Sequence, residues 1–130
     1  MRVLLIDDDE LIASSLRDYL VMQSCDVDVA PEAVSADALL RASNYDVVML
    51  DPYLTGGVQS EDVALVDSIS LLQPRASVIV LTGYSSPALE SAAASGRIDA
   101  LLTKPQSVLA LSELLVSAPT LMSTTKGQSQ

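Results

Sequence analysis

The feature that most constrains the fold of this chain is an alternation of short apolar runs with longer helical patterns. The runs are RVLLI, CDVDVA, DVVML, SVIVL and ALLT. A stretch with helical periodicity follows each of them. Strands that alternate with helices are typical of βαβ units, which build a parallel sheet with helices on both faces. The sequence therefore predicts an α/β fold of five such units.

Three of the runs also indicate their places in the sheet. DVVML and SVIVL are almost entirely apolar, as expected of central strands that are covered on both faces. CDVDVA alternates charged and apolar residues, which is typical of an edge strand. We therefore expect the third and fourth strands at the centre and the second at an edge.

Five helices are predicted to follow the strands. The first is expected to turn one apolar face to the core, made of Leu11, Ile12, Leu16, Tyr19 and Leu20. The second covers residues 33–42. The third covers about residues 61–72, with Ser60 as its N-cap. The fourth has Ser86 as its N-cap and Pro87 as its first residue, and it closes at Gly96.

The fifth predicted helix begins after Ser107 and has two apolar faces. Its inward stripe is expected to contain Val108, Leu111, Leu114 and Leu115. Leu109 and Val116 are seven residues apart and share a second face. The Ser/Thr/Gln-rich residues 119–130 are expected to be a mobile tail after a domain of residues 1–118.

Composition excludes several classes of function. The 130 residues carry a formal net charge of −10, so direct binding to nucleic acid is not expected. The chain has no His, which excludes His-based catalysis and His metal sites. No apolar stretch approaches the roughly 20 residues that span a bilayer, so no membrane association is expected. The single Cys25 cannot form an internal disulfide, which fits a buried thiol in the reducing cytoplasm.

Charged or hydroxyl side chains come at the ends of four of the five predicted strands. Asp7 and Asp8 follow the first strand, Asp51 the third, Thr82 the fourth and Lys104 the fifth. In an open α/β sheet, ligands bind beyond the carboxyl ends of the strands. An acid after a single strand is most often a helix cap or a solvated turn, but that explanation does not readily cover all four strands. The sequence therefore predicts a functional site at this edge.

The residue types at this edge suit phosphoryl transfer. Three carboxylates make a hard oxygen site for a divalent ion, Mg²⁺ or Mn²⁺, which would offset the repulsion within the acidic run DDDE. Thr82 offers a hydroxyl donor, and Lys104 a compact positive charge for a carboxylate or phosphoryl oxygen. A metal, a Lys, a hydroxyl and a carboxylate nucleophile are together the components of phosphoryl transfer onto Asp.

Four segments, in their order and spacing, closely resemble the receiver domains of two-component response regulators. They are LLIDDDE, YDVVMLDPYLTGG, VIVLTGY and LLTKP, and the resemblance covers residues 2 to about 117. It implies a flavodoxin-like, doubly wound, five-stranded parallel sheet with strand order 2-1-3-4-5. It also implies that Asp51 accepts a phosphoryl group from a histidine kinase or phosphotransfer protein, and that the domain is not a separate enzyme.

The resemblance further implies a role for each site residue. Asp8 would bind Mg²⁺ directly and Asp7 largely through water, with Asp51 and the backbone carbonyl of Tyr53 as the other ligands. Thr82 would follow the phosphoryl group, Lys104 would contact it, and the bond before Pro105 would be cis. In such domains phosphorylation shifts a two-state equilibrium and reshapes the face of the fourth helix, fifth strand and fifth helix. That face would bind a downstream protein or a second copy of the chain.

The sequence departs from the family pattern at three places. Leu54-Thr55 stands where Met-Pro is usual, and Gln106 stands where an aromatic residue usually follows Lys-Pro. Leu101 stands where a Tyr or Phe usually swings inward with the Thr. The departure at Leu101 affects the inward movement of an aromatic side chain that is usual in the family, and not the phosphorylation of Asp51.

Three other classes of protein share part of this pattern. A phosphatase of the haloacid-dehalogenase type needs D-x-D-x-[TV] after its first strand, but Glu10 stands where Thr or Val belongs, and the late acidic pair is missing. A flavodoxin-like flavin binder needs Ser, Thr or Gly in its first loop to hold a phosphate group, but this chain has four acids there, which would repel it. A pseudo-receiver would keep the fold as a binding module without phosphorylation, with Leu101 and Leu54-Thr55 as its main support. The 130 residues show no DNA-binding or catalytic effector, which fits a receiver that acts alone or one piece of a longer protein.

Overall fold

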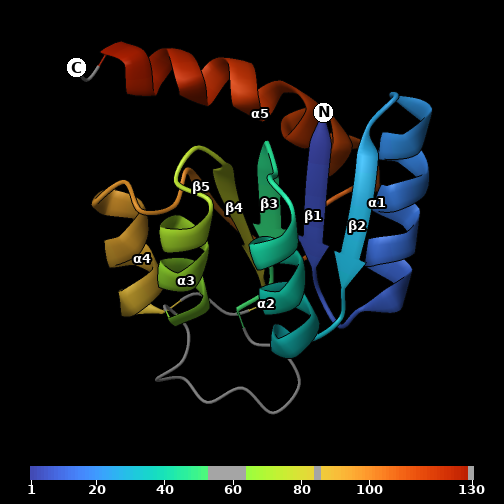
Figure 1. The fold of residues 1–130 in the computed structure, drawn as a ribbon, viewed down its shortest axis with the longest axis horizontal. Coiled ribbons are helices and arrows are strands. Elements are labelled where there is room, and N and C mark those ends of the chain that lie inside the picture. Colours follow the sequence, from blue (N-terminus) through green and yellow to red (C-terminus); the bar gives the residue numbers. More distant parts are fainter. Residues whose placement is uncertain (53–63, 84–85, 129–130) are drawn as a thin grey trace.

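The computed structural model describes residues 1–52, 64–83 and 86–128, and along them five strands alternate with five helices (Figure 1). In chain order the elements are β1 (Arg2–Ile6), α1 (Glu10–Met22), β2 (Asp26–Ala30), α2 (Ala33–Ala42), β3 (Val47–Leu50), α3 (Ala64–Leu72), β4 (Ser77–Thr82), α4 (Pro87–Ala94), β5 (Ala100–Thr103) and α5 (Val108–Gln128). The predicted alternation is confirmed. Among the described residues, every helix is too short or too polar to cross a lipid bilayer.

The five strands form one parallel sheet in the order β2-β1-β3-β4-β5. The predicted flavodoxin-like topology is therefore confirmed, as are the central positions of β3 and β4 and the edge position of β2. After β2 the chain returns past β1 to form β3, so the strand order reverses between β1 and β3. In open α/β sheets, ligands bind beyond the carboxyl ends of the strands at such a reversal.

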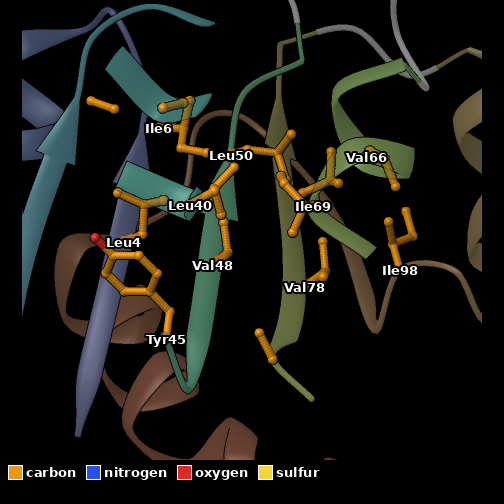
Figure 2. Close-up of a cluster of buried hydrophobic side chains, with 14 of the residues drawn as sticks. Leu4, Ile6, Leu40, Tyr45, Val48, Leu50, Val66, Ile69, Val78 and Ile98 are labelled. Atoms are coloured by element: carbon orange, nitrogen blue, oxygen red, sulfur yellow. The ribbon is translucent and has the colours of Figure 1, made fainter. Parts of the chain in front are cut away.

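Side chains of the central strands alternate between two apolar clusters, one on each face of the sheet. From β3, Val48 and Leu50 join the cluster with α2, α3 and α4, part of which is drawn in Figure 2. Val47 and Met49 join the cluster with α1 and α5. Because helices cover both faces, every position of β3 is buried, which explains its continuous apolar run.

Helix α1 buries a narrower face than the sequence predicted. Ala13, Leu16 and Leu20 are buried, whereas Leu11 is 76% exposed and Tyr19 is 40% exposed. The prediction that Leu11 and Tyr19 face the core is therefore wrong. Leu11 precedes Leu16 by five residues, which in a helix of 3.6 residues per turn places it nearly on the opposite side.

The predicted ends of α4 are confirmed. The Ser86 hydroxyl accepts a hydrogen bond from the Leu89 amide, and Pro87 is the first helical residue. Gly96, with φ of +82°, follows the end of the helix. Helix α3 is described from Ala64, and its predicted start and its N-cap Ser60 lie outside the described residues.

Helix α5 has the two faces that the sequence predicted. Its inward stripe is buried or partly buried, whereas Leu109 is 52% exposed and Val116 is 38% exposed. The helix continues to Gln128, with Pro119 inside it. The domain boundary at residue 118 and the mobility of the tail remain predictions.

At the amino-terminal edge of the sheet, the buried Gln73 side chain ties the end of α2 to the start of β3. Its Nε2 donates to the carbonyls of Leu40 at 2.8 Å and Ser43 at 2.6 Å, and its Oε1 accepts from the Tyr45 amide at 3.0 Å. Carbonyls at the end of a helix lack partners within the helix. Gln73 therefore satisfies three backbone groups where α2 ends.

Tyr45 joins three segments at the same edge. Its hydroxyl donates to Asp28 Oδ2 at 2.6 Å, and Arg2 pairs with the same oxygen at 3.1 Å. The Arg2 guanidinium carbon lies 5.4 Å from the centre of the Tyr45 ring. Burial and the Asp28 carboxylate raise the pKa of Tyr45 to about 12. These contacts connect β1, β2 and the segment before β3 at the end opposite the predicted site.

Replacing Ser24 with Gly should stabilise the turn between α1 and β2. Among the described residues, Ser24 is the only non-glycine residue with positive φ, at +65°. Glycine adopts this conformation without a Cβ clash, so the free energy of unfolding in urea should rise by about 0.5–1 kcal/mol. Ser14→Gly, at an exposed helical position of α1, is the control and should lose about 0.5 kcal/mol. A loss in Ser24→Gly would contradict the prediction.

Candidate functional site

Three residues at the carboxyl ends of the strands are fixed by backbone hydrogen bonds that extend the sheet. The bonds run from Asp7 N–H to the Ala30 carbonyl (3.1 Å), from Asp51 N–H to the Ile6 carbonyl (2.8 Å) and from Lys104 N–H to the Thr82 carbonyl (2.7 Å). Each backbone donor continues the pairing of neighbouring strands. The site residues are therefore held by the same network that holds the sheet together.

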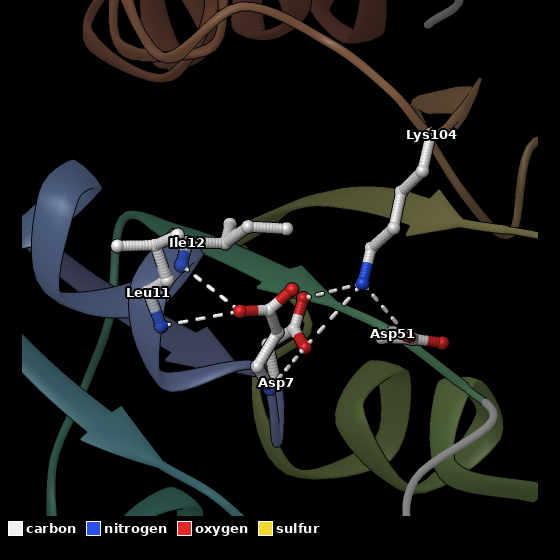
Figure 3. Close-up of polar contacts among 6 residues, drawn as sticks. Asp7, Leu11, Ile12, Asp51 and Lys104 are labelled. Carbon is white, nitrogen blue, oxygen red and sulfur yellow. Dashed lines mark hydrogen bonds and ion pairs between the residues drawn. The ribbon is translucent and has the colours of Figure 1, made fainter.

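Lys104 lies between two carboxylates that come from different strands. Its Nζ is 3.1 Å from Asp7 Oδ2 and 3.0 Å from Asp51 Oδ2 (Figure 3). The side chains of Asp7 and Asp51 are only 1% and 10% exposed. Water and salt screen partly buried charges less than exposed ones. The structure thus brings Asp7, Asp51 and Lys104 into one network with its charges close together.

The protonation of these groups reflects this crowding. Burial raises the pKa of Asp7, although the Asp9 amide and Lys104 oppose the shift. Burial lowers the pKa of Lys104, but the Asp51 and Asp7 carboxylates outweigh it, so the net pKa of Lys104 is raised. Lys104 therefore remains a cation, whereas the negative charge on Asp7 costs the folded state free energy once the pH exceeds the ordinary range of Asp.

Asp7, Asp8 and Asp51 form an acidic group of the kind that holds a metal ion. One carboxylate oxygen from each lies within 4.8 Å of the other two. Asp7 and Asp51 are buried, and Asp8 is exposed to solvent. Within the described residues, Asp7 Oδ2 accepts no hydrogen bond of good geometry, although Lys104 Nζ is 3.1 Å away. Hard oxygen donors, one of them facing solvent, fit a divalent cation such as Mg²⁺ or Mn²⁺.

The remaining predicted site residues lie at the same edge or outside the described residues. Thr82 ends β4, is fully buried and pairs in register with Thr103 of β5. The bond between Lys104 and Pro105 is cis, as the resemblance implied. The predicted carbonyl ligand, that of Tyr53, lies outside the described residues.

The structure describes two of the three departures from the family pattern. Leu101 is partly buried and packs against the cluster that includes Leu89 and Ala92 of α4. Gln106 is exposed, and its side chain donates to the Thr103 carbonyl at 2.9 Å. Leu54-Thr55 lies outside the described residues. An aliphatic side chain thus packs against the α4 cluster from the β5 position that departs from the family pattern.

The role of Asp9 at this site was missed by the sequence analysis. Its Oδ1 accepts hydrogen bonds from the amides of Leu11 at 3.1 Å and Ile12 at 3.2 Å, which makes it the N-cap of α1. Its own amide donates to Asp7 Oδ1 at 2.9 Å. The signal was present in the sequence, because Asp is a favoured N-cap residue and a predicted helix follows it.

The four consecutive acids therefore have four different environments. Asp7 is buried against Lys104, and Asp8 is exposed but belongs to the acidic group. Asp9 caps α1, and Glu10 lies in the first turn of that helix. The amino end of a helix favours negative charge. The helix thus stabilises Asp9 and Glu10, and the remaining repulsion is concentrated on Asp7, Asp8 and Asp51.

The chain is similar to known proteins over most of its length. The family model of the response regulator receiver domain matches residues 3–116. A comparison with curated proteins finds no match. Among solved structures, this chain is 30% identical to the NtrC4 receiver domain, determined in solution as a beryllofluoride-activated dimer. The TM-score is 0.76, and the match covers 90% of this chain and 94% of that chain.

Two further solved structures are similar over most of the chain. A response regulator from Burkholderia pseudomallei, which contains a phosphorylated aspartic acid, a calcium ion and citrate, is 26% identical, with a TM-score of 0.76 over 99% of this chain and 74% of that chain. A receiver domain protein (CheY-like) from Methanospirillum hungatei JF-1 is 23% identical, with a TM-score of 0.82 over 95% of this chain and 97% of that chain. The latter match supports the fold alone.

Proposed function

Because the chain belongs to the response regulator receiver domain family, we propose that it acts in the cytoplasm and accepts a phosphoryl group on Asp51 from a histidine kinase or phosphotransfer protein. A receiver domain is a signalling component and not a separate catalytic enzyme. The observation that carries the proposal is the position of Asp51. This carboxylate follows a central strand, lies 3.0 Å from Lys104 Nζ and shares an acidic group with Asp7 and Asp8.

In the proposed reaction an oxygen of Asp51 forms a bond to phosphorus. The bond from phosphorus to the imidazole nitrogen of the donor breaks, and that nitrogen keeps the electron pair. Lys104 would contact an oxygen of the transferred group and balance its charge, and the Thr82 hydroxyl would donate a hydrogen bond to it. Because the sheet already fixes the backbone of these residues, their contribution is position and charge.

Asp7, Asp8 and Asp51, with the backbone carbonyl of Tyr53, would hold Mg²⁺ or Mn²⁺. A bound divalent cation neutralises negative charge on a transferring phosphoryl group. The raised pKa of Asp7 supports a cation site here, because a positive charge near that carboxylate would offset the cost of its burial. The spacing of the carboxylate oxygens, within 4.8 Å of one another, also suits a shared ion.

Metal-dependent phosphorylation tests this proposal. With acetyl phosphate and Mg²⁺, the protein should gain the mass of one phosphoryl group by intact mass spectrometry, and with EDTA it should gain none. With beryllofluoride and Mg²⁺, the backbone amide NMR signals of Asp51 and its neighbours should shift. Absence of both responses would contradict the proposal and favour a pseudo-receiver that keeps the fold as a binding module only.

Asp8→Asn should stabilise the protein without metal and weaken its binding of Mg²⁺. The change removes one of three crowded carboxylates, so the free energy of unfolding in EDTA should rise by an amount on the order of 1 kcal/mol. Calorimetric titration with Mg²⁺ measures the second effect. A marked loss of stability in EDTA would show instead that the Asp8 carboxylate is a structural group.

We infer that the face formed by α4, β5 and α5 is the output surface, which binds a downstream protein or a second copy of the chain. Leu109 and Val116 are exposed on one side of α5, with Glu113 between them along the helix. The related NtrC4 receiver domain is a dimer when activated by beryllofluoride, which supports a second copy as the partner. Leu101 of β5 packs against the apolar cluster that includes Leu89 and Ala92 of α4. Through this contact it would transmit the effect of phosphorylation to the output surface.

Leu109→Lys combined with Val116→Lys should abolish self-association in the presence of beryllofluoride and Mg²⁺. The two charges would have to be buried at an apolar contact, which costs free energy. Analytical ultracentrifugation measures the association, and phosphorylation of Asp51 should be unchanged. Val34→Lys with Leu71→Lys, which changes exposed residues of α2 and α3, is the control and should associate like the wild type. A wild-type protein that stays monomeric with beryllofluoride would exclude the dimer and leave a downstream protein as the partner.

A further inference from the structure

Asp9 connects helix α1 to the acidic site through four hydrogen bonds. Its carboxylate accepts from the amides of Leu11 at 3.1 Å and Ile12 at 3.2 Å, and its carbonyl accepts from the Ala13 amide at 3.0 Å. The fourth bond runs from the Asp9 amide to Asp7 Oδ1, at 2.9 Å. Three of the bonds belong to the first turn of α1 and one belongs to the site, so the conformation of Asp9 affects both.

The hydrogen bond from Asp9 is one of the contacts that orient the Asp7 carboxylate, and Lys104 Nζ donates a longer one to the same oxygen, at 3.5 Å. With Oδ1 held by the Asp9 amide, Oδ2 lies 3.1 Å from Lys104 Nζ (Figure 3). Lys104 Nζ is in turn 3.0 Å from Asp51 Oδ2. Because Asp7 is 1% exposed, groups of the protein, rather than bulk solvent, set its orientation. The Asp9 amide is thus one end of a chain of contacts that reaches Asp51.

Asp9 also restricts the backbone on which Asp8 is carried. Asp8 lies between Asp7, whose amide donates to the Ala30 carbonyl, and Asp9, whose backbone is fixed by the cap. The exposed Asp8 carboxylate therefore extends from a segment that is held on both sides. Fixing a ligand before an ion arrives lowers the entropic cost of binding that ion.

The charge of Asp9 has a different use from the charges of Asp7, Asp8 and Asp51. Among the described residues, the group whose oxygens lie within 4.8 Å of one another contains those three acids and not Asp9. The Asp9 carboxylate instead faces the amides at the amino end of α1, where negative charge is favoured. Asp9 therefore does not qualify as a further ligand, and its hydrogen-bonded connection to the site runs through its backbone amide.

We propose that Asp9 is a positioning residue for the metal site. By capping α1, it holds the peptide between Asp8 and Asp9 so that the N–H of Asp9 orients Asp7 toward Lys104 and a bound cation. This inference rests on the proposed function, because it concerns the affinity of the same site for Mg²⁺. On this inference, residue 9 needs a side chain that accepts the hydrogen bonds of the helix cap, and it does not need a negative charge.

Calorimetric titration with Mg²⁺ alone tests this inference in variants that separate capping from charge. Asn and Ser cap helices about as well as Asp, Thr caps less well, and Ala does not cap. Asp9→Asn and Asp9→Ser should bind Mg²⁺ within about twofold of the wild type, and Asp9→Ala about fivefold more weakly. Asp9→Thr should fall between them, and it preserves the test if Asp9→Ala does not fold.

Asp18→Gly is the matched control, because it also removes one exposed carboxylate from α1 and weakens that helix far from its amino end. Its affinity for Mg²⁺ should equal that of the wild type. Equal weakening in Asp9→Asn, Asp9→Ser and Asp9→Ala would mean that charge matters and would overturn the inference. Wild-type affinity in both Asp9→Ala and Asp9→Thr would also overturn it. If the wild type binds no Mg²⁺ and gains no phosphoryl group, the proposed function fails too, whereas failure confined to the variants overturns only the role of Asp9.

Discussion

Asp51→Asn should abolish phosphoryl incorporation from acetyl phosphate and Mg²⁺. An amide of nearly the same shape occupies the position, but it lacks the nucleophilic carboxylate oxygen. The neighbouring acids do not replace it on the geometry seen here, because Asp7 is 1% exposed and held by Lys104, and Asp8 lies at the solvent side of the acidic group. Intact mass spectrometry should show the added mass in the wild type and none in the variant.

The control for this prediction is Asp18→Asn, which makes the same chemical change on the exposed side of α1. It should incorporate as much phosphate as the wild type. Asp51→Asn should remain folded, since the hydrogen bond that fixes residue 51 to the sheet comes from its backbone amide. Equal incorporation in Asp51→Asn and the wild type would show that the acceptor is another residue.

Gln73→Leu should lower the free energy of unfolding by about 2–5 kcal/mol. The substitution removes the partners of three backbone groups: the carbonyls of Leu40 and Ser43 and the amide of Tyr45. Each buried group left without a partner costs about 1–3 kcal/mol, and water reaching Ser43 reduces the sum. Urea or thermal unfolding measures the loss.

Gln23→Leu makes the same substitution at an exposed side chain and is the matched control, with an expected change within about 0.5 kcal/mol. Phosphorylation of folded Gln73→Leu should persist, because Gln73 lies at the edge of the sheet opposite Asp51. If Gln73→Leu is as stable as Gln23→Leu, solvent rather than Gln73 satisfies the end of α2.

The topology was predictable because its determinants are local in the sequence. A strand covered on both faces needs apolar residues along nearly its whole length, and DVVML and SVIVL are apolar after their first residue. An edge strand tolerates charge, and CDVDVA contains it. The site was predictable for a related reason: residues that end neighbouring parallel strands must meet at one edge. Asp7, Asp51 and Lys104 lie far apart in the sequence but within about one ion-pair distance in space.

Features that depend on contacts between distant segments were not predictable in the same way. The hydrogen bonds of Gln73 reach residues 28 and 33 positions away, and no local pattern identifies a Gln as their donor and acceptor. The rotation of α1 about its own axis depends on its packing against β2 and α5, so Leu11 was placed on the wrong face. For Asp9 the local capping signal existed, but it was hidden within a run of four acids.

The burial of Tyr45 gives this protein an optical reporter at the edge of the sheet opposite Asp51. The chain has no Trp and four Tyr, so its near-ultraviolet signals come chiefly from phenol rings. The Tyr45 ring is held by Asp28 and Arg2 and is 5% exposed, an asymmetric environment that favours a strong circular dichroism band. The difference between the spectra of the wild type and Tyr45→Phe isolates that band. If Mg²⁺ or beryllofluoride alters this band, the response extends from the site to Tyr45 at the opposite edge of the sheet, and if the band is unchanged, the response does not reach Tyr45.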